Sequence, residues 1–138
     1  MTDTFKIDSK ELDRIIGALD GNKEKAGRMI GFELEAEAKR RAPRDTSAMA
    51  NSIYTVTKKY DGYSQASGAA RQANKDAETN QHPKPSGNVL ARVGPCVNYA
   101  VFVEMGTSRM AAQPFLYPAA EVVVNKINDG SYWKVLIE

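Results

Sequence analysis

Reactive side chains are scarce in this chain of 138 residues, which has one cysteine, one histidine and one tryptophan. The single cysteine, Cys96, excludes an intrachain disulfide and suits synthesis in a reducing compartment. The single histidine, His82, has no second histidine, cysteine or aspartate at ligand spacing, so we interpret it as a loop residue. Because no nucleophile is paired with a base in a recognisable motif, we expect no enzyme, no cofactor and no metal site.

A charge excess and a long apolar run are also missing. The 19 basic and 17 acidic residues give a formal net charge of +2, whereas a dedicated nucleic-acid-binding protein normally has a clustered basic excess. No apolar run is long enough to cross a bilayer, and we expect neither a signal peptide nor a membrane contact. The length predicts one domain over residues 1–138, and we expect it to be made in the cytoplasm.

The N-terminal part of the chain is predicted to be helical. Apolar residues recur there at the spacing of an amphipathic helix, first as Leu12, Ile15, Ile16 and Leu19. A second helical stripe runs from about Lys23 to Arg41, and residues 20–22 predict an interruption between the two. Pro43 predicts the end of the second stripe, because the residue before a proline is disfavoured in the helical conformation.

Two strands and a long insertion follow. Residues 52–58 alternate in the manner of a strand, and residues 89–93 do so again before Gly94 and Pro95, which predict a turn. Residues 61–88 contain no large aliphatic side chain. Such a composition cannot bury enough apolar area to order itself, so we expect a long flexible insertion there.

The C-terminal part is predicted to hold one more helix and one more strand. Pro118 belongs in the first turn of a helix that continues through Ile127. Residues 131–138 alternate like an edge strand, and their apolar side chains on both faces suggest a partner. The fold class is therefore α+β, with a long N-terminal helix, broken or continuous, packed on a small antiparallel sheet beside two shorter helices.

The densest pattern lies between Val97 and Ala119. Asn98 is predicted to cap a short helix that carries Tyr99, Phe102 and Val103 on one face, and Gly106 to end it in the left-handed conformation. A strand is the rival interpretation, because alternate positions from Val97 to Val103 are apolar. We favour the helix. Glu104 near the helix end is expected to accept backbone or threonine hydrogen bonds in the following turn.

These residues resemble a known family signature. Tyr99-Ala100, Glu104, Gly106-Thr107-Ser108 and Gln113 to Ala119 are similar to "YAxxvExGTsrmxaxPFlxPA" of small neck and tail-completion proteins in long-tailed bacteriophages and prophages. Residues 42–46, followed by 51–53, resemble the family's "aPvdTGxLxnSI". Ser47 replaces the usual glycine of that second motif, and Met49 stands near its usual leucine. The resemblance covers most of the chain except residues 60–88.

The resemblance assigns roles to particular side chains. It implies motif or structural roles for eight residues: Pro43, Asp45, Thr46, Tyr99, Gly106, Pro114, Phe115 and Pro118. We expect Phe115, between two prolines, to anchor its connection to the core. Four further residues are candidates for a subunit interface: Glu104, Thr107, Arg109 and Trp133. An arginine such as Arg109 in an exposed connection pairs across a subunit boundary as readily as it stays solvated.

The function implied by the resemblance is structural. Proteins of this kind sit at the head-tail junction of the virion, so we expect a ring around the DNA channel, with six-fold symmetry favoured. One face would contact the head-closure or connector protein and the other the tail terminator or tail tube, while DNA passes without sequence-specific binding. A minor tail or tail-terminator protein is the runner-up. A small nucleic-acid-binding or toxin-like protein using Lys58, Lys59 and Arg71 is the alternative from another class.

Overall fold

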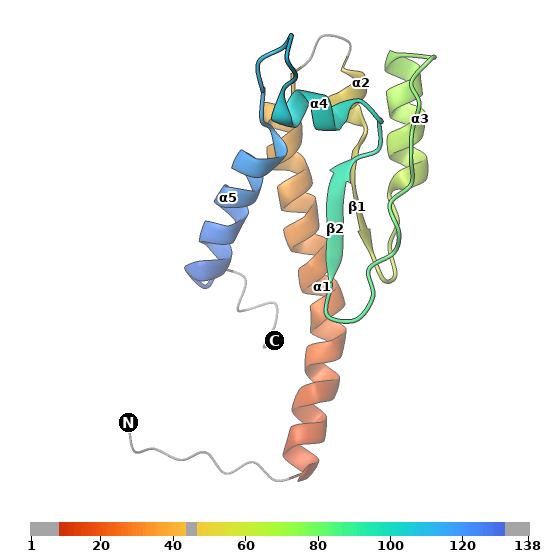
Figure 1. Ribbon diagram of the computed structural model, residues 1–138. Helices are drawn as coiled ribbons and strands as arrows, with labels where there is room; N and C mark the ends of the chain where they lie inside the picture. Colours follow the sequence, from red (N-terminus) through yellow and green to blue (C-terminus); the bar gives the residue numbers. More distant parts are fainter. Residues whose placement is uncertain (1–8, 44–46, 132–138) are drawn as a thin grey trace.

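The computed structural model describes residues 9–43 and 47–131, and for residue 9 and residues 11–20 it describes the backbone only. Within these ranges five helices and two strands follow one another along the chain (Figure 1). They are α1 (Ser9–Arg41), α2 (Ala48–Asn51), β1 (Ile53–Thr57), α3 (Tyr63–Ala73), β2 (Ala91–Pro95), α4 (Ala100–Met105) and α5 (Leu116–Asn128). The predicted α+β class is confirmed.

The long helix α1 is continuous from Ser9 to Arg41, so the predicted interruption at residues 20–22 is wrong. A glycine in a helix interior costs only about 1 kcal/mol relative to alanine, which one position in a helix of 33 residues tolerates. The helix ends two residues before Pro43, as the proline predicts. Its N-terminal part extends beyond the sheet and beyond the other helices (Figure 1).

The sheet has two antiparallel strands, with Tyr54 opposite Gly94 and Thr55 opposite Val93. The predicted turn at Gly94 and Pro95 is wrong, because both residues belong to β2. Proline is tolerated here because it ends the strand, in a register position opposite Ile53. The sheet packs directly on α1, where a Cβ on Gly31 would lie 2.5 Å from Cγ2 of Thr55. Gly31 therefore sets the close approach of helix and sheet.

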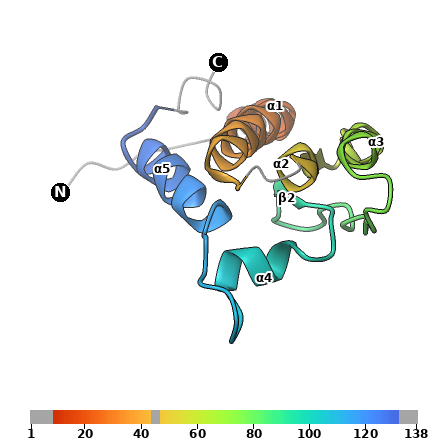
Figure 2. The same cartoon turned by 90° about the horizontal axis from the view of Figure 1, so that it is seen from above.

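The expectation that residues 61–88 form a flexible insertion without packed structure is wrong for residues 63–73, which form α3. This helix buries Ala66, Ser67 and Ala70 instead of large side chains. Small residues permit close approach to the neighbouring elements, and α3 lies beside α2 and β1 (Figures 1 and 2). The composition did not predict this helix, because the prediction considered only large apolar side chains. The helix packs instead through small side chains that let its backbone approach the neighbouring elements closely.

The remaining part of the insertion follows the sheet. The backbone N–H of Asn80 donates to the carbonyl of Cys96 at 2.7 Å, and the N–H of Asn98 donates to the carbonyl of Glu78 at 3.1 Å. These bonds connect the insertion to the residues just after β2. The segment between α3 and β2 is therefore held by backbone hydrogen bonds although most of its side chains are exposed.

Helix α5 lies against the C-terminal half of α1, on the side away from α3 (Figures 1 and 2). Its Ala119 and Val123 are buried, and Lys126 forms an ion pair with Glu33 of α1. This confirms the predicted last helix with Pro118 in its first turn. The predicted edge strand falls almost entirely on residues 132–138, which lie outside the described residues.

Candidate assembly interface

Helix α4 follows β2 and is joined to α5 by a loop (Figures 1 and 2). Residues Ala100–Met105 are helical, which confirms the favoured interpretation over the rival strand. Asn98 does not cap this helix, contrary to the prediction. Tyr99 occupies the cap position without a side-chain hydrogen bond, and the side chain of Asn98 donates to Glu78 Oε2 at 2.8 Å instead. Asn98 thus ties α4 to the segment that follows α3.

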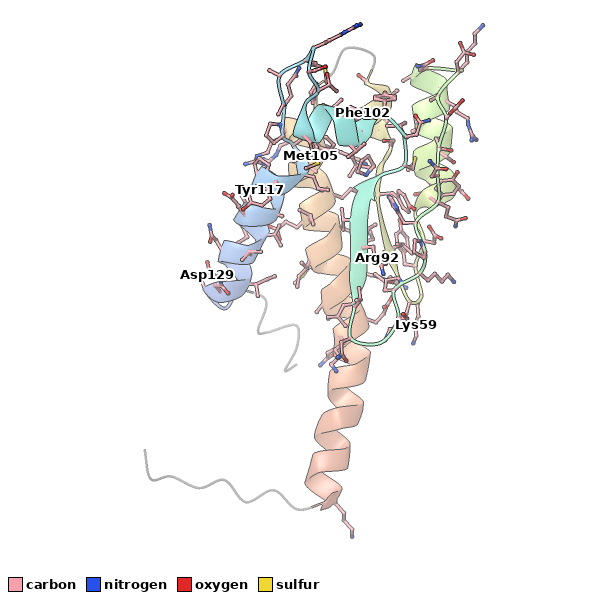
Figure 3. All side chains as sticks on the ribbon, viewed as in Figure 1. Lys59, Arg92, Phe102, Met105, Tyr117 and Asp129 are labelled. Atoms are coloured by element: carbon pink, nitrogen blue, oxygen red, sulfur yellow. The ribbon has the colours of Figure 1, made fainter. Side chains whose placement is uncertain are left out.

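The two faces of α4 differ in what they contact. Ala100 is buried, and Tyr99 and Val103 pack against the core cluster that contains Phe115. The other face is apolar and exposed: Phe102 is 56% exposed and Met105 is 75% exposed. Placing Phe102 on the inner face with Tyr99 and Val103 was therefore wrong. Figure 3 shows Phe102 and Met105 along α4, with the exposed Tyr117 at the start of α5 close by.

Gly106 ends α4 with a positive φ of 78° and an extended ψ of 170°. The predicted need for a glycine at this position is confirmed, although its ψ differs from that of the left-handed helical region. A Cβ at this position would lie 2.7 Å from the backbone nitrogen of Ala112. Only glycine permits the chain to fold back on itself here.

Thr107 organises the tip of the connection that follows. Its Oγ1 accepts the backbone N–H groups of Arg109 at 3.2 Å and Met110 at 3.1 Å. Its own N–H donates to the carbonyl of Met110 at 2.8 Å. Thr107 therefore stabilises the loop through hydrogen bonds within it. The side chains of Arg109 and Met110 in this loop are exposed to solvent.

Glu104 caps helix α5 from the preceding helix. Its Oε1 accepts the backbone N–H groups of Phe115 at 3.1 Å and Leu116 at 2.9 Å, and its Oε2 accepts that of Tyr117 at 3.1 Å. The first N–H groups of a helix have no intrahelical partner, and a carboxylate also suits the positive end of the helix dipole. Glu104 thus accepts backbone hydrogen bonds as predicted, but at the start of α5 and not in the turn that directly follows α4.

Phe115 is the anchor that its proline frame predicts. It is 1% exposed and belongs to the main core cluster, together with Ile53 and Val97. Pro114 is exposed, whereas Pro118 lies in the first turn of α5. The rigid, capped turn therefore places Phe115 in the core and leaves α4 with an apolar outer face.

A family model described as "Bacteriophage HK97-gp10, putative tail-component" matches residues 9–106, from the start of α1 to the glycine that ends α4. The chain belongs to this family. No curated protein and no solved structure matches the chain. The match includes Tyr99, Glu104 and Gly106, and it ends before Phe115 and Pro118.

Membership of a family of tail components points to a structural role for this chain. Among the described residues, no group of three or more histidine, cysteine, aspartate and glutamate side chains is placed to hold a metal ion. The helices in the same part of the chain are too short or too polar for a membrane span.

Several predicted site residues can be placed only in part. Pro43 is half-buried just beyond α1, whereas Asp45, Thr46 and Trp133 lie outside the described residues. Arg109 is exposed at the tip of its loop. Glu104 in the last turn of α4, and Thr107 and Arg109 in the connection to α5, lie within six residues of one another, and the first two already make internal hydrogen bonds.

The basic residues of the nucleic-acid alternative do not form one patch. The Nζ of Lys58 donates to the carbonyl of Gly87 at 2.9 Å, and Lys59 lies at the same end of the sheet (Figure 3). Arg71 lies in the last turn of α3, where its guanidinium donates to Thr79 Oγ1 at 2.9 Å. A phosphate backbone would have no continuous basic surface along these three side chains.

Sequence reasoning missed a groove of about 440 Å³ beside β2. It runs between β2, helix α4, the first residues of α5 and the loop that carries His82. His82 is a loop residue, as predicted, but its ring stacks on Tyr54 with centroids 5.3 Å apart, and its Nε2 lies 2.9 Å from the carbonyl oxygen of Pro95. No spacing rule pairs residue 82 with residue 54, so no sequence pattern could have predicted this contact.

Proposed function

We propose that this chain is a subunit of the head-tail junction, a neck or tail-completion protein that assembles into a ring around the DNA channel. The observation that carries the proposal is the apolar outer face of α4. Val101, Phe102 and Met105 are each more than half exposed, as is Tyr117 at the start of α5. Exposed apolar patches on small domains mark interaction sites. The helix that carries this patch is held in place by the hydrogen bonds from the start of α5 to Glu104.

Assembly would proceed without chemical turnover. A closed ring needs a heterologous interface, in which two different patches of one subunit meet. The α4 patch is one such surface, with Arg109 beside it as a polar contact at its rim. We favour six subunits, one face of the ring contacting the head-closure or connector protein and the other the tail terminator or tail tube. The chain is made in the host bacterial cytoplasm and ends in the virion.

The direct test is a phage or prophage strain that lacks the gene. We expect DNA-filled heads and separate tails that fail to join, as counted by electron microscopy of lysates. Normal, infectious, joined particles would rule out the junction role. Heads joined to tails of irregular length would support the runner-up, a tail terminator.

A matched pair of variants tests the surface itself. Phe102→Asp should lower the fraction of joined particles, because it places a charge in the apolar α4 face. Val124→Asp is the control, since Val124 on α5 is 49% exposed and lies outside the patch. Both proteins should unfold at the temperature of the unaltered chain, because surface substitutions usually change stability by less than about 0.5 kcal/mol. Equal joining by the two variants would remove α4 from the interface.

A further inference from the structure

Among the residues that the structure describes, no strand pairs with the outer edge of β2. The carbonyl of Thr55 accepts the N–H of Gly62 at 3.0 Å, and the N–H of Thr57 donates to the carbonyl of Tyr60 at 2.7 Å. Thr55 and Thr57 therefore direct their backbone groups away from β2. Their partners across the sheet are Val93 and Ala91. In an antiparallel pair such partners direct their own N–H and C=O groups to the opposite edge.

These outward groups of β2 have no backbone hydrogen bond to any other described residue. The next outward carbonyl, that of Pro95, differs because the ring of His82 lies 2.9 Å from it. The groove of about 440 Å³ borders four consecutive residues of β2, from Arg92 to Pro95, together with α4 and the start of α5. No described residue of β1 or α1 lines it, so the groove follows the outer edge of the strand.

We propose that this edge binds residues 132–138 of a second copy of the chain as an added strand. The inference rests on the proposed ring, for which it names the second contact between subunits. An unpaired strand edge is a template for an extended segment, whose backbone supplies the hydrogen bonds and whose side chains supply specificity. Val93 and Ala91 offer two N–H and two C=O groups to such a segment.

The sequence of residues 132–138 fits this groove. It contains no proline or glycine, and apolar residues occupy both sets of alternate positions. A segment of seven residues extends over about 23 Å, more than the roughly 17 Å of a five-residue strand. Glu138 complements Arg92, the exposed cation on the groove. The groove offers the segment apolar walls at Val97, Val101 and Leu116.

We assign the site to a second copy because the proposed ring needs a contact between two different patches of one subunit, and the donor segment and the acceptor edge are such a pair. Such a head-to-tail contact repeats from subunit to subunit until the ring closes. The donor follows α5, whereas the acceptor is β2, and both elements lie on α1 (Figures 1 and 2). Each subunit would thus give one strand and receive one.

A photo-crosslinking side chain at position 92 in the full-length protein identifies the occupant. Equal amounts of chains labelled with light and heavy nitrogen are mixed, and crosslinked peptides are read by mass spectrometry. We expect crosslinks from position 92 to residues 132–138 that join a light to a heavy chain. Crosslinks within one isotope only would show that the chain's own end fills the groove, and would overturn the proposal. Crosslinks to another virion protein alone would overturn it as well.

A substitution at the edge tests the hydrogen bonds. Val93→Pro removes an outward N–H without removing a bond to β1, and it should weaken self-association roughly tenfold or more by light scattering. Removal of residues 132–138 should do the same, whereas Val93→Thr keeps the N–H and should assemble normally. Circular dichroism establishes that each variant is folded. Unchanged assembly of both the proline variant and the truncated chain overturns this inference and leaves the ring proposal intact, which only the gene-deletion strain refutes.

Discussion

The carboxylate of Glu104 holds the backbone N–H of Phe115 at 3.1 Å and so connects the end of α4 to the start of α5. Ten residues, 106–115, separate the two helices, yet hydrogen bonds hold both ends of this connection. The N–H of Gln113 donates to the carbonyl of Val103 at 2.8 Å beside the Glu104 contacts. The exposed face of α4 is therefore fixed relative to the core through one carboxylate and one buried aromatic ring.

Glu104→Ala should destabilise the fold by about 1–3 kcal/mol, because three N–H groups at the start of α5 lose a charged acceptor. Glu104→Gln keeps one oxygen acceptor, so its loss should be smaller. Urea unfolding followed by circular dichroism measures both changes. Glu121→Ala, at an exposed site of α5, the helix that Glu104 caps, is the control and should change little. A loss no greater than that of the control would mean that the cap contributes nothing.

Phe115→Ala should cost roughly 3–5 kcal/mol, the usual range for deleting a buried aromatic ring. The ring is 1% exposed among small and branched residues, so its loss leaves a cavity in the main core cluster. Phe102→Ala is a matched control, because the same deletion on an exposed residue removes few contacts. Thermal unfolding compares the two. A loss below about 1 kcal/mol for Phe115→Ala would contradict its anchoring role.

The free energy of unfolding should fall as the pH rises above about 8.5, where an unfolded cysteine begins to ionise. Burial raises the pKa of the Cys96 thiol, and burial likewise raises the pKa of the Tyr54 hydroxyl, with Asp61 adding to the shift. Both groups are neutral when protonated, so the folded chain keeps protons that the unfolded chain releases. The two protonated groups contribute fully to the free energy of unfolding below the pKa values that they have in the unfolded chain. This contribution is lost progressively as the pH rises above those values.

Unfolding experiments at about pH 7 and about pH 10.5 test whether the free energy of unfolding falls as the pH rises. Tyr54→Phe keeps the ring but removes the ionising hydroxyl, and Cys96→Ala removes the thiol. Each variant should show a shallower loss of stability with pH than the unaltered chain. The thiol should also resist alkylation at neutral pH until the protein unfolds, because Cys96 is 1% exposed. Equal pH dependence in all three chains would exclude these two groups as the cause.

The sequence predicted the elements whose signals are local. Alternation located β1, Pro43 the end of α1, and Pro118 the first turn of α5. The position of Gly106 at a helix end predicts the left-handed conformation, and its φ of 78° agrees whereas its ψ of 170° does not. These features depend on neighbours within a few residues. A reading of the chain alone can therefore find them.

The parts that sequence reasoning missed depend on distant contacts. Helix α3 buries only small side chains, and its packing on β1 depends on how closely two backbones approach. The inner and outer faces of α4 were confused because the position of α5 decides which face is covered. The groove beside β2 arises from four segments that are separate in the chain. Composition and periodicity carry no information about such a site.

Because residues 63–73 form a helix, a protease should not cut throughout residues 61–88. Residues 63–73 are protected as α3, and Arg71 at its end is held by Thr79. Exposed residues follow in short runs at 75–76, 80–81, 83–84 and 86–89, and the backbone N–H groups of Asn80 and His82 donate to Cys96 and Tyr54. A broad-specificity protease should therefore cut the free subunit first within 74–88, because exposed segments between elements open most readily.

Mass spectrometry of the first fragments locates the cut. Destabilising α3 provides the contrast: Ala70→Gly lowers helix propensity at a buried site and should extend cleavage into residues 63–73. If the ring assembles as proposed, the same segment should be cut more slowly in purified particles than in the free subunit. Early cleavage inside α3 of the unaltered chain would mean that the helix opens in solution. In that event the original expectation of a flexible insertion over all of 61–88 would be restored.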